Sequence, residues 1–238
     1  MRTARICLIV LAVLPFGGGS TPPLRTAAPL PAGSSSHGSE LAAAQRNSYR
    51  AEVRARIAES GTFIPHILVQ NDSLLVRWSL VDGTAITVYV ESSSLVDGGR
   101  RAQVLAAFDR WQDAAAARVR FALVDDASDA SIVVRWARGL PWYRAGQTDV
   151  RWGPGGWLQH AIVSLATVDR VGSPVGEDAL YAVALHEVGH ALGLGHSDDT
   201  RDVMFPVIGV RDLTVRDRAT AGLLYALAPG SLRDPIRR

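Results

Sequence analysis

The sequence predicts an α+β domain in which a small sheet packs with three helices. Three observations predict it. Short runs are rich in β-branched and aromatic residues, longer segments carry apolar residues three or four positions apart, and glycine or proline separates the two kinds of segment. The chain has 238 residues, of which 47% are hydrophobic, so one packed domain with additional sequence is expected.

The elements follow in a mixed order along the chain. The predicted strands are residues 85–90, 119–124, 131–136 and 160–167, and the predicted helices are residues 100–117, 178–194 and 214–227. The last helix has a capping box, because Thr214 precedes Asp217 by three positions. Residues 137–157 are rich in glycine and proline and are predicted to form a long, structured loop.

The N-terminal residues 1–19 are predicted to be a secretory signal peptide. Arg2 and Arg5 precede an apolar run over residues 6–16, and small residues follow it. The run is too short to span a bilayer, which requires roughly 20 residues, so we expect a secreted or extracytoplasmic protein without stable membrane insertion. The alternative is a buried N-terminal strand or helix.

Residues 20–39 contain much proline, serine, glycine and alanine and are predicted to be a flexible tether. Residues 40–83 form an N-terminal extension, in which Tyr49, Val53 and Ile57 recur every fourth residue and predict a helix with one apolar stripe. This helix either packs on the main domain or belongs to a propeptide that covers an active site, and periodicity does not distinguish the two. The main domain is expected over residues 84–231.

Charge and cysteine content exclude several classes of protein. The 25 basic residues are all arginine and face 23 acidic residues, for a formal net charge of +2, which gives no electrostatic reason to expect nucleic-acid binding. The single cysteine, Cys7, excludes an internal disulfide framework and a cysteine-rich zinc site. We expect a monomer.

The residues that carry chemistry lie between positions 186 and 206. His186 and His190 are four residues apart on a predicted helix, so their rings project from one face and can chelate one zinc ion. Glu187 stands where a carboxylate can reach a zinc-bound water, and Gly193 can end the helix in a left-handed turn that returns the chain, so that His196 supplies a third nitrogen. Three protein ligands leave one position open for water, as in catalytic zinc sites.

This segment resembles the metzincin zinc endopeptidases, whose pattern is HExxHxxGxxH followed by a methionine turn. Ser197 after the third histidine, and Met204 with Pro206, resemble the matrixin branch. The resemblance runs from about residue 84 to 230. It implies a small twisted mixed sheet, an active-site helix and a C-terminal helix. It also implies a secreted zinc-dependent endopeptidase with one catalytic ion, in which Glu187 activates the zinc-bound water and Met204 lies beneath the zinc as an apolar floor.

The resemblance also implies how a polypeptide substrate binds. An extended peptide is expected to pair with an edge strand near residues 158–162. The side chain after the cleaved bond is expected in a pocket between the catalytic helix and the segment after the methionine, lined by Ala182, Pro206 and Ile208. Because Ala182 is small, we expect a deep pocket that prefers a large apolar residue.

The sequence departs from the family in two respects. His160 falls on a position that holds a second, structural zinc in relatives, but the other expected ligands are missing, so we interpret it as an ordinary hydrogen-bonded histidine. No cysteine follows Cys7, so latency through a thiolate is excluded. If residues 40–80 inhibit the enzyme, a carboxylate such as Asp72 or Asp82, or simple steric cover, must replace that thiolate, although both aspartates are more typical of turns. A calcium ion is left open as a further cofactor, but no residue pattern in the sequence supports it. The alternative function is a zinc-binding module or pseudoenzyme that binds protein without cleaving it, against which the intact Glu187 argues.

Overall fold

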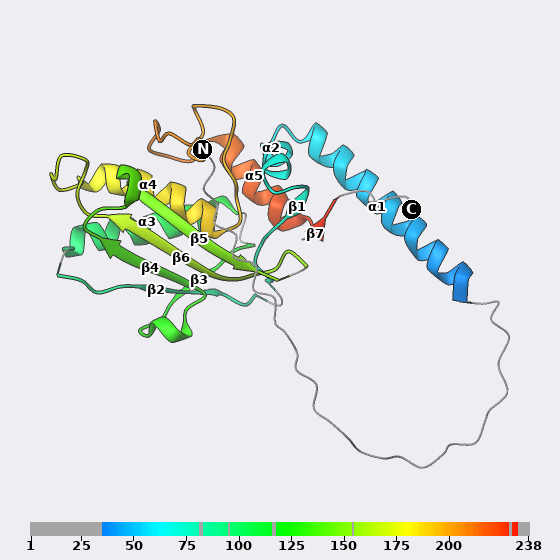
Figure 1. Cartoon of the computed structure of the whole chain (residues 1–238), viewed down its shortest axis with the longest axis horizontal. Coiled ribbons are helices and arrows are strands. Elements are labelled where there is room, and N and C mark those ends of the chain that lie inside the picture. The colour runs from blue at the N-terminus through cyan, green and yellow to red at the C-terminus, as the bar shows by residue number, and fades with distance from the viewer. Residues whose placement is uncertain are drawn as a thin grey trace, which may run out of the picture.

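The computed structural model describes residues 35–80, 83–94, 96–115, 118–153, 155–228 and 230–232. The expected signal peptide, most of the expected tether and Asp82 lie outside these residues. The described residues form an α+β domain in which helices lie against a mixed sheet (Figure 1). This confirms the predicted fold class.

The sheet has five strands in the order β3-β2-β4-β6-β5. The strands are β2 (Ile86–Val90), β3 (Phe121–Leu123), β4 (Ile132–Ala137), β5 (Gly146–Trp152) and β6 (Leu158–Ala166). Strands β3, β2, β4 and β6 are parallel to one another, and β5 pairs with β6 in the antiparallel direction. Burial alternates along β2, as expected for a strand with one face on the core.

The structure corrects the expected edge strand. Residues 158–162 belong to β6, which lies between β4 and β5, so they are not at the edge. The edge strand is β5, inside the segment predicted to be a loop. Its sequence, GQTDVRW, has no fully buried residue. An edge strand does not need the apolar runs that identify internal strands, so the sequence pattern missed it.

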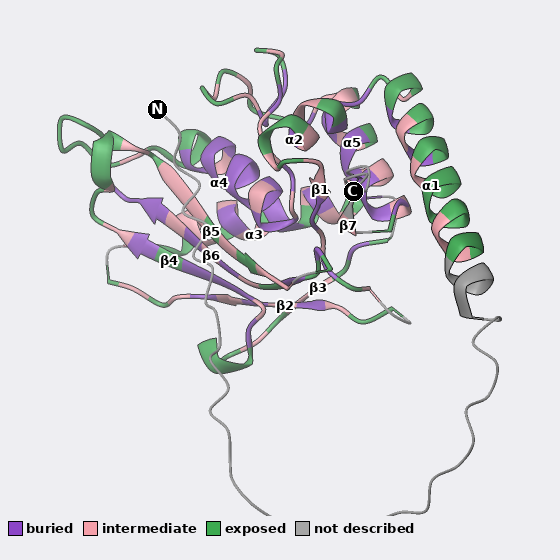
Figure 2. Cartoon of the chain, turned by 45° about the vertical axis from the view of Figure 1, so that its right-hand side comes forward, coloured by how far each residue is buried: buried purple, intermediate pink, exposed green. Residues whose placement is uncertain are grey.

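Helices α3 (Gly98–Ala114) and α4 (Glu177–Ala191) lie on the same face of the sheet (Figures 1 and 2). A hydrogen bond joins them, because the indole Nε1 of Trp111 donates to the carbonyl of Leu185 at 2.7 Å. Helix α4 has ten buried residues, in agreement with its apolar character on several sides. Helix α5 (Val215–Ala226) begins at the predicted capping box of Thr214 and Asp217.

The N-terminal extension, expected from residue 40, contains α2 (Ile64–Gln70), β1 (Leu74–Leu75) and α1 (Ser35–Glu59), which begins five residues before that boundary. Much of α1 is exposed (Figure 2), although Val53 and Ile57 are buried. Strand β1 pairs with β7 (Gly230–Ser231), so the last part of the N-terminal extension lies beside the C-terminal end of the described chain. None of the described helices is both long enough and apolar enough to cross a membrane.

Candidate metal centre

Helix α4 places His186 and His190 on one face, as their spacing predicts. The helix ends at Ala191 with Leu192 as its C-cap, and Gly193, which follows, has a φ of 96°. The amide of Gly193 bonds to the carbonyl of His190 at 2.9 Å, and that of Leu194 bonds to the carbonyl of Gly189 at 3.0 Å. This pair of bonds is the Schellman motif, which requires the left-handed conformation that glycine adopts readily.

The turn after α4 brings His196 to the two helical histidines. The ring centroids are 4.7 Å apart for His186 and His190, 5.4 Å for His186 and His196, and 4.8 Å for His190 and His196. One ring nitrogen from each lies within 4.8 Å of the others. Among the described residues, these three form the cluster that could hold a metal ion.

The hydrogen bonds of the helical histidines determine which nitrogens face the centre. Nδ1 of His186 lies 2.7 Å from the carbonyl oxygen of Val203, and Nδ1 of His190 lies 2.8 Å from that of Leu194. A carbonyl only accepts, so each Nδ1 carries the proton and each neutral ring presents an unprotonated Nε2. The two Nε2 atoms are 3.1 Å apart. Two lone pairs at this distance repel each other unless a cation lies between them. The separation is also close to the value of about 3.3 Å for two nitrogens on one tetrahedral zinc ion.

The surroundings keep all three rings neutral. Burial lowers the pKa of His186 to about 3 and the pKa values of His190 and His196 to about 4, and the neighbouring histidines add to the effect. Neutral imidazoles are the form that binds metals. The donor set therefore fits a divalent zinc ion.

Glu187 is buried in α4 beside the edge strand. The hydroxyl of Thr148 in β5 lies 2.6 Å from Glu187 Oε2 and 3.0 Å from the carbonyl oxygen of Glu187. A Cβ at Gly146 would lie 2.6 Å from the Glu187 side chain, so this glycine leaves room for the carboxylate. Burial raises the pKa of Glu187 to about 7, and the Thr148 hydrogen bond opposes that shift. A carboxyl with such a pKa can accept and release a proton near neutral pH.

Met204 is fully buried next to α4. A Cβ at Gly189 would lie 2.3 Å from the Met204 sulfur, so glycine at that position lets the methionine approach the helix. The turn is fixed from the other side by Asp217 of α5, whose carboxylate accepts the amides of Val203 at 3.0 Å and Met204 at 3.4 Å. The same turn supplies the Val203 carbonyl that holds His186.

A charged network supports the loop that carries His196. Ser197 is buried and donates to Asp202, while Arg216 donates to Asp202 at 2.9 Å and to Asp198 at 2.7 Å. The sequence interpretation assigned no role to Arg216 or Asp202. In the sequence, Arg216 is the second residue of the final helix and Asp202 lies between His196 and Met204. Residues of these types are too common at such positions to predict a contact.

The remaining predicted residues lie outside the three-histidine cluster. His160 is in β6. Burial lowers its pKa most, and the nearby Arg151 and Arg135 lower it further. These cationic surroundings disfavour a second metal ion. Asp72 has a φ of 53° in the turn before β1, in agreement with its interpretation as a turn residue. The expected pocket residues are a buried Ala182, an exposed Pro206 and a half-buried Ile208.

The fold and this centre define a metzincin type of domain, in which the third histidine follows a glycine turn and a buried methionine packs against α4. In agreement with this, the profile of the family described as Matrixin matches residues 82–226, more than half of the chain. The chain therefore belongs to the matrixin family.

Named relatives share shorter segments. The chain is 34% identical to matrilysin from Felis catus over 99 residues, which are 34% of this chain and 32% of the relative. It is 38% identical to matrilysin from Homo sapiens over 94 residues, 35% of this chain and 33% of the relative. It is 42% identical to metalloendoproteinase 1 from Glycine max over 73 residues, 25% of this chain and 24% of the relative. The matches thus span a third or less of each relative.

Proposed function

We propose that this protein is a secreted, zinc-dependent endopeptidase with one catalytic ion, held by His186, His190 and His196. The observation that carries the proposal is the convergence of ring nitrogens from three histidines, with the buried Glu187 next to His186 in α4. Membership in the matrixin family and the names of the relatives support it.

The proposed mechanism assigns a role to each group. When bound, zinc supplies a Lewis acid that polarises the scissile carbonyl and makes water more acidic. Glu187 accepts a proton from the attacking water and passes it to the leaving amine. Its burial favours this role, because the raised pKa lets the same carboxyl act as base and then as acid. Thr148 holds one carboxylate oxygen from the edge strand.

We propose that an extended substrate binds along β5, because β5 is the sheet edge that contacts Glu187. The substrate backbone would add a strand there, and the side chain after the cleaved bond would enter a pocket lined by Ala182, Pro206 and Ile208. A peptide library read by mass spectrometry should show large apolar residues at that position. A preference for charged residues would contradict the pocket assignment.

The direct test compares wild type with Glu187→Ala on casein, with and without a chelator. Wild type should cleave casein and lose activity with the chelator, while the variant should bind zinc but cleave at least about 100-fold more slowly. If zinc-loaded wild type binds casein and leaves it intact, the protein is a zinc-binding module. If the two proteins cleave equally, the proposed role of Glu187 is refuted.

Secretion is a separate part of the proposal and rests on the pattern of residues 1–19. N-terminal sequencing of protein recovered outside the producing cell should give a first residue after this segment. Recovery of a chain that still begins at Met1 inside the cell would contradict it.

A further inference from the structure

We propose that residues 62–80, here called the inner segment, are a permanent part of the catalytic unit, and that Gln70 within it is a positioning residue for His196. The proposal rests on the proposed function, since it assigns His196 as the third zinc ligand. The proposal divides the N-terminal extension into α1, which maturation could remove, and the inner segment, which would stay.

Gln70, at the end of α2, holds the backbone of His196 from both sides. Its Oε1 accepts the His196 amide at 3.0 Å, and its Nε2 donates to the His196 carbonyl at 3.1 Å. The planar amide thus pairs with the main chain as a neighbouring strand would. His186 and His190 are oriented through their ring Nδ1 atoms, whereas His196 is oriented through its backbone by Gln70.

The adjoining residue leaves space for this contact. A Cβ at Gly195 would lie 2.6 Å from Gln70 Oε1 and 3.3 Å from Ile67. Ile67 is 1% exposed and packs in the core, so α2 is anchored while its last residue reaches the loop. The 126 positions between Gln70 and His196 make this a tertiary contact rather than a local turn.

The inner segment also contacts the end of α4 that carries His190. The indole Nε1 of Trp78 donates to the carbonyl of Ala191 at 2.8 Å, and both groups are buried. The carbonyl oxygen of Val76 approaches Gly193 so closely that a Cβ there would lie 2.2 Å from it. Removing this segment would expose the glycine turn that returns the chain to His196.

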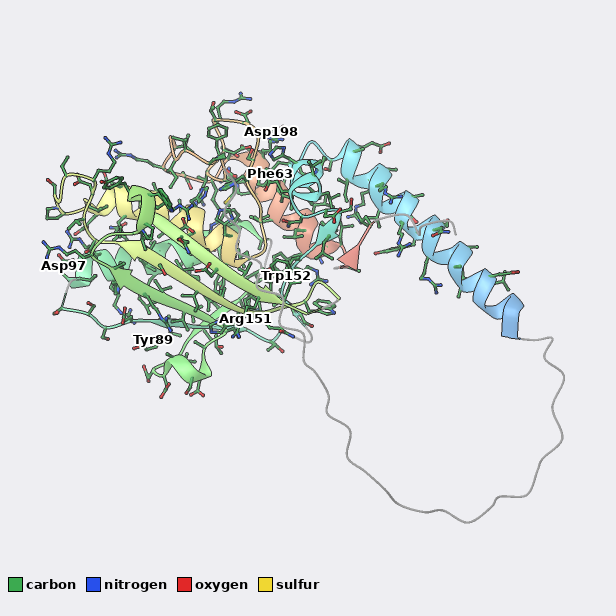
Figure 3. All side chains as sticks on the ribbon, viewed as in Figure 1. Phe63, Tyr89, Asp97, Arg151, Trp152 and Asp198 are labelled. Atoms are coloured by element: carbon green, nitrogen blue, oxygen red, sulfur yellow. The ribbon has the colours of Figure 1, made fainter. Side chains whose placement is uncertain are left out.

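At its other end the inner segment packs on α5. Phe63 is fully buried, its amide donates to the Thr220 hydroxyl at 3.2 Å, and Arg216 lies over its ring at 5.5 Å. Arg216 also pairs with Asp198, two residues after His196, and Phe63 and Asp198 are labelled near each other at the top of the view in Figure 3. The segment therefore supports the His196 loop from two directions.

Helix α1 is different. It is largely exposed, and Gly61, with a φ of 64°, separates it from the inner segment. Any segment removed on maturation would therefore end before Thr62, and the functional domain would begin there rather than at residue 84.

The test of Gln70 uses the full chain with Gln70→Ala, Gln70→Glu and the control Val69→Ala, whose side chain is 80% exposed. Zinc affinity is measured by competition with a chromophoric chelator, and stability by thermal unfolding of the zinc-free protein. Gln70→Ala should bind zinc about tenfold more weakly. Gln70→Glu, which keeps the acceptor, should recover part of the loss, and Val69→Ala should match wild type.

Three outcomes have distinct meanings. Weaker zinc binding by Gln70→Ala with an unchanged zinc-free midpoint supports positioning. A lowered midpoint with unchanged zinc affinity shows a purely structural role and overturns the assignment. If wild type itself binds no zinc, the proposed function fails first.

Limited proteolysis of the zinc-loaded full chain tests the boundary. N-terminal sequencing should find cuts in α1 or near Gly61, and the product beginning near Thr62 should retain zinc. A stable, zinc-binding product that begins after residue 80 would overturn the proposal.

Discussion

The Nδ1 protons of His186 and His190 are committed to the backbone carbonyls of Val203 and Leu194. These carbonyls fix both the tautomer and the direction of each ring, so the metal-binding nitrogens are oriented before an ion arrives. Val203 is itself held by Asp217 of the last helix. The motif predicted the three histidines, but not the carbonyls and carboxylate that orient them, because those groups are distant in sequence or belong to the main chain.

The hydroxyl of Thr148 orients the carboxylate of Glu187, and its removal can be tested. Thr148→Val keeps the shape of the side chain and removes the hydroxyl that bonds Glu187 at 2.6 Å. The carboxylate loses its orientation, so kcat should fall about tenfold, or ~1.4 kcal/mol, with little change in KM or zinc content. Steady-state kinetics on a fluorogenic peptide measures both constants. Thr148→Ser should remain near wild type, and an unaltered kcat in Thr148→Val would show that the hydroxyl has no role.

At the scale of elements, glycines allow α4 to lie close to its neighbours. Gly189 admits Met204, Gly146 admits Glu187, and Gly193 turns the chain against the Val76 carbonyl. Only the turn at Gly193 was predicted, because a glycine after a helix is a sequence signal, whereas a glycine that leaves room for a distant group is not. The bounds of the apolar strands and of three long helices were predicted within a few residues. Their apolar periodicity is a local property of the sequence, so it can be recognised without tertiary contacts.

Two of the elements that the sequence pattern missed contact the site. Strand β5 is polar and lies at the edge, and α2 has only seven residues, so neither carries a clear periodic signal. Both nevertheless contact the site, through Thr148 and Gln70. Their assignment requires knowledge of the tertiary contacts that stabilise them.

Gly193→Ala tests the turn, with Gly222→Ala in α5 as the matched control. A Cβ at Gly193 would meet the Val76 carbonyl at 2.2 Å with a φ of 96°, whereas nothing lies within 4 Å of one at Gly222. We expect Gly193→Ala to lose about 2 kcal/mol or more of unfolding free energy and to weaken zinc binding. Gly222→Ala should gain roughly 0.5–1 kcal/mol. Urea unfolding measures both, and equal effects would contradict the close approach.

For the whole molecule, the buried histidines make the zinc-free protein sensitive to acid. Their pKa values are about 3 to 4 when folded and about 6.5 when unfolded. Between these values the unfolded chain binds more protons, so stability is retained above pH 6.5 and falls as the pH is lowered through that window. Glu187, with its pKa raised to about 7, acts in the opposite direction and offsets part of the loss.

We therefore expect the zinc-free protein to lose ~2 kcal/mol or more of unfolding free energy between pH 7 and pH 5. Urea unfolding at each pH measures the change. Glu187→Gln removes the opposing carboxyl, so its loss over the same interval should be larger. A stability that stays constant from pH 7 to pH 5 would contradict the buried, neutral histidines.

The most direct test of the central claim is a zinc titration of metal-free protein, followed by cleavage of a peptide substrate and by mass spectrometry of the products. We expect no cleavage without metal and a linear rise in activity that ends at one zinc per chain, with internal peptide bonds cut. Full activity without zinc, or a zinc-loaded protein that leaves every peptide intact, would contradict it. An end point at two zinc ions per chain would contradict the single site.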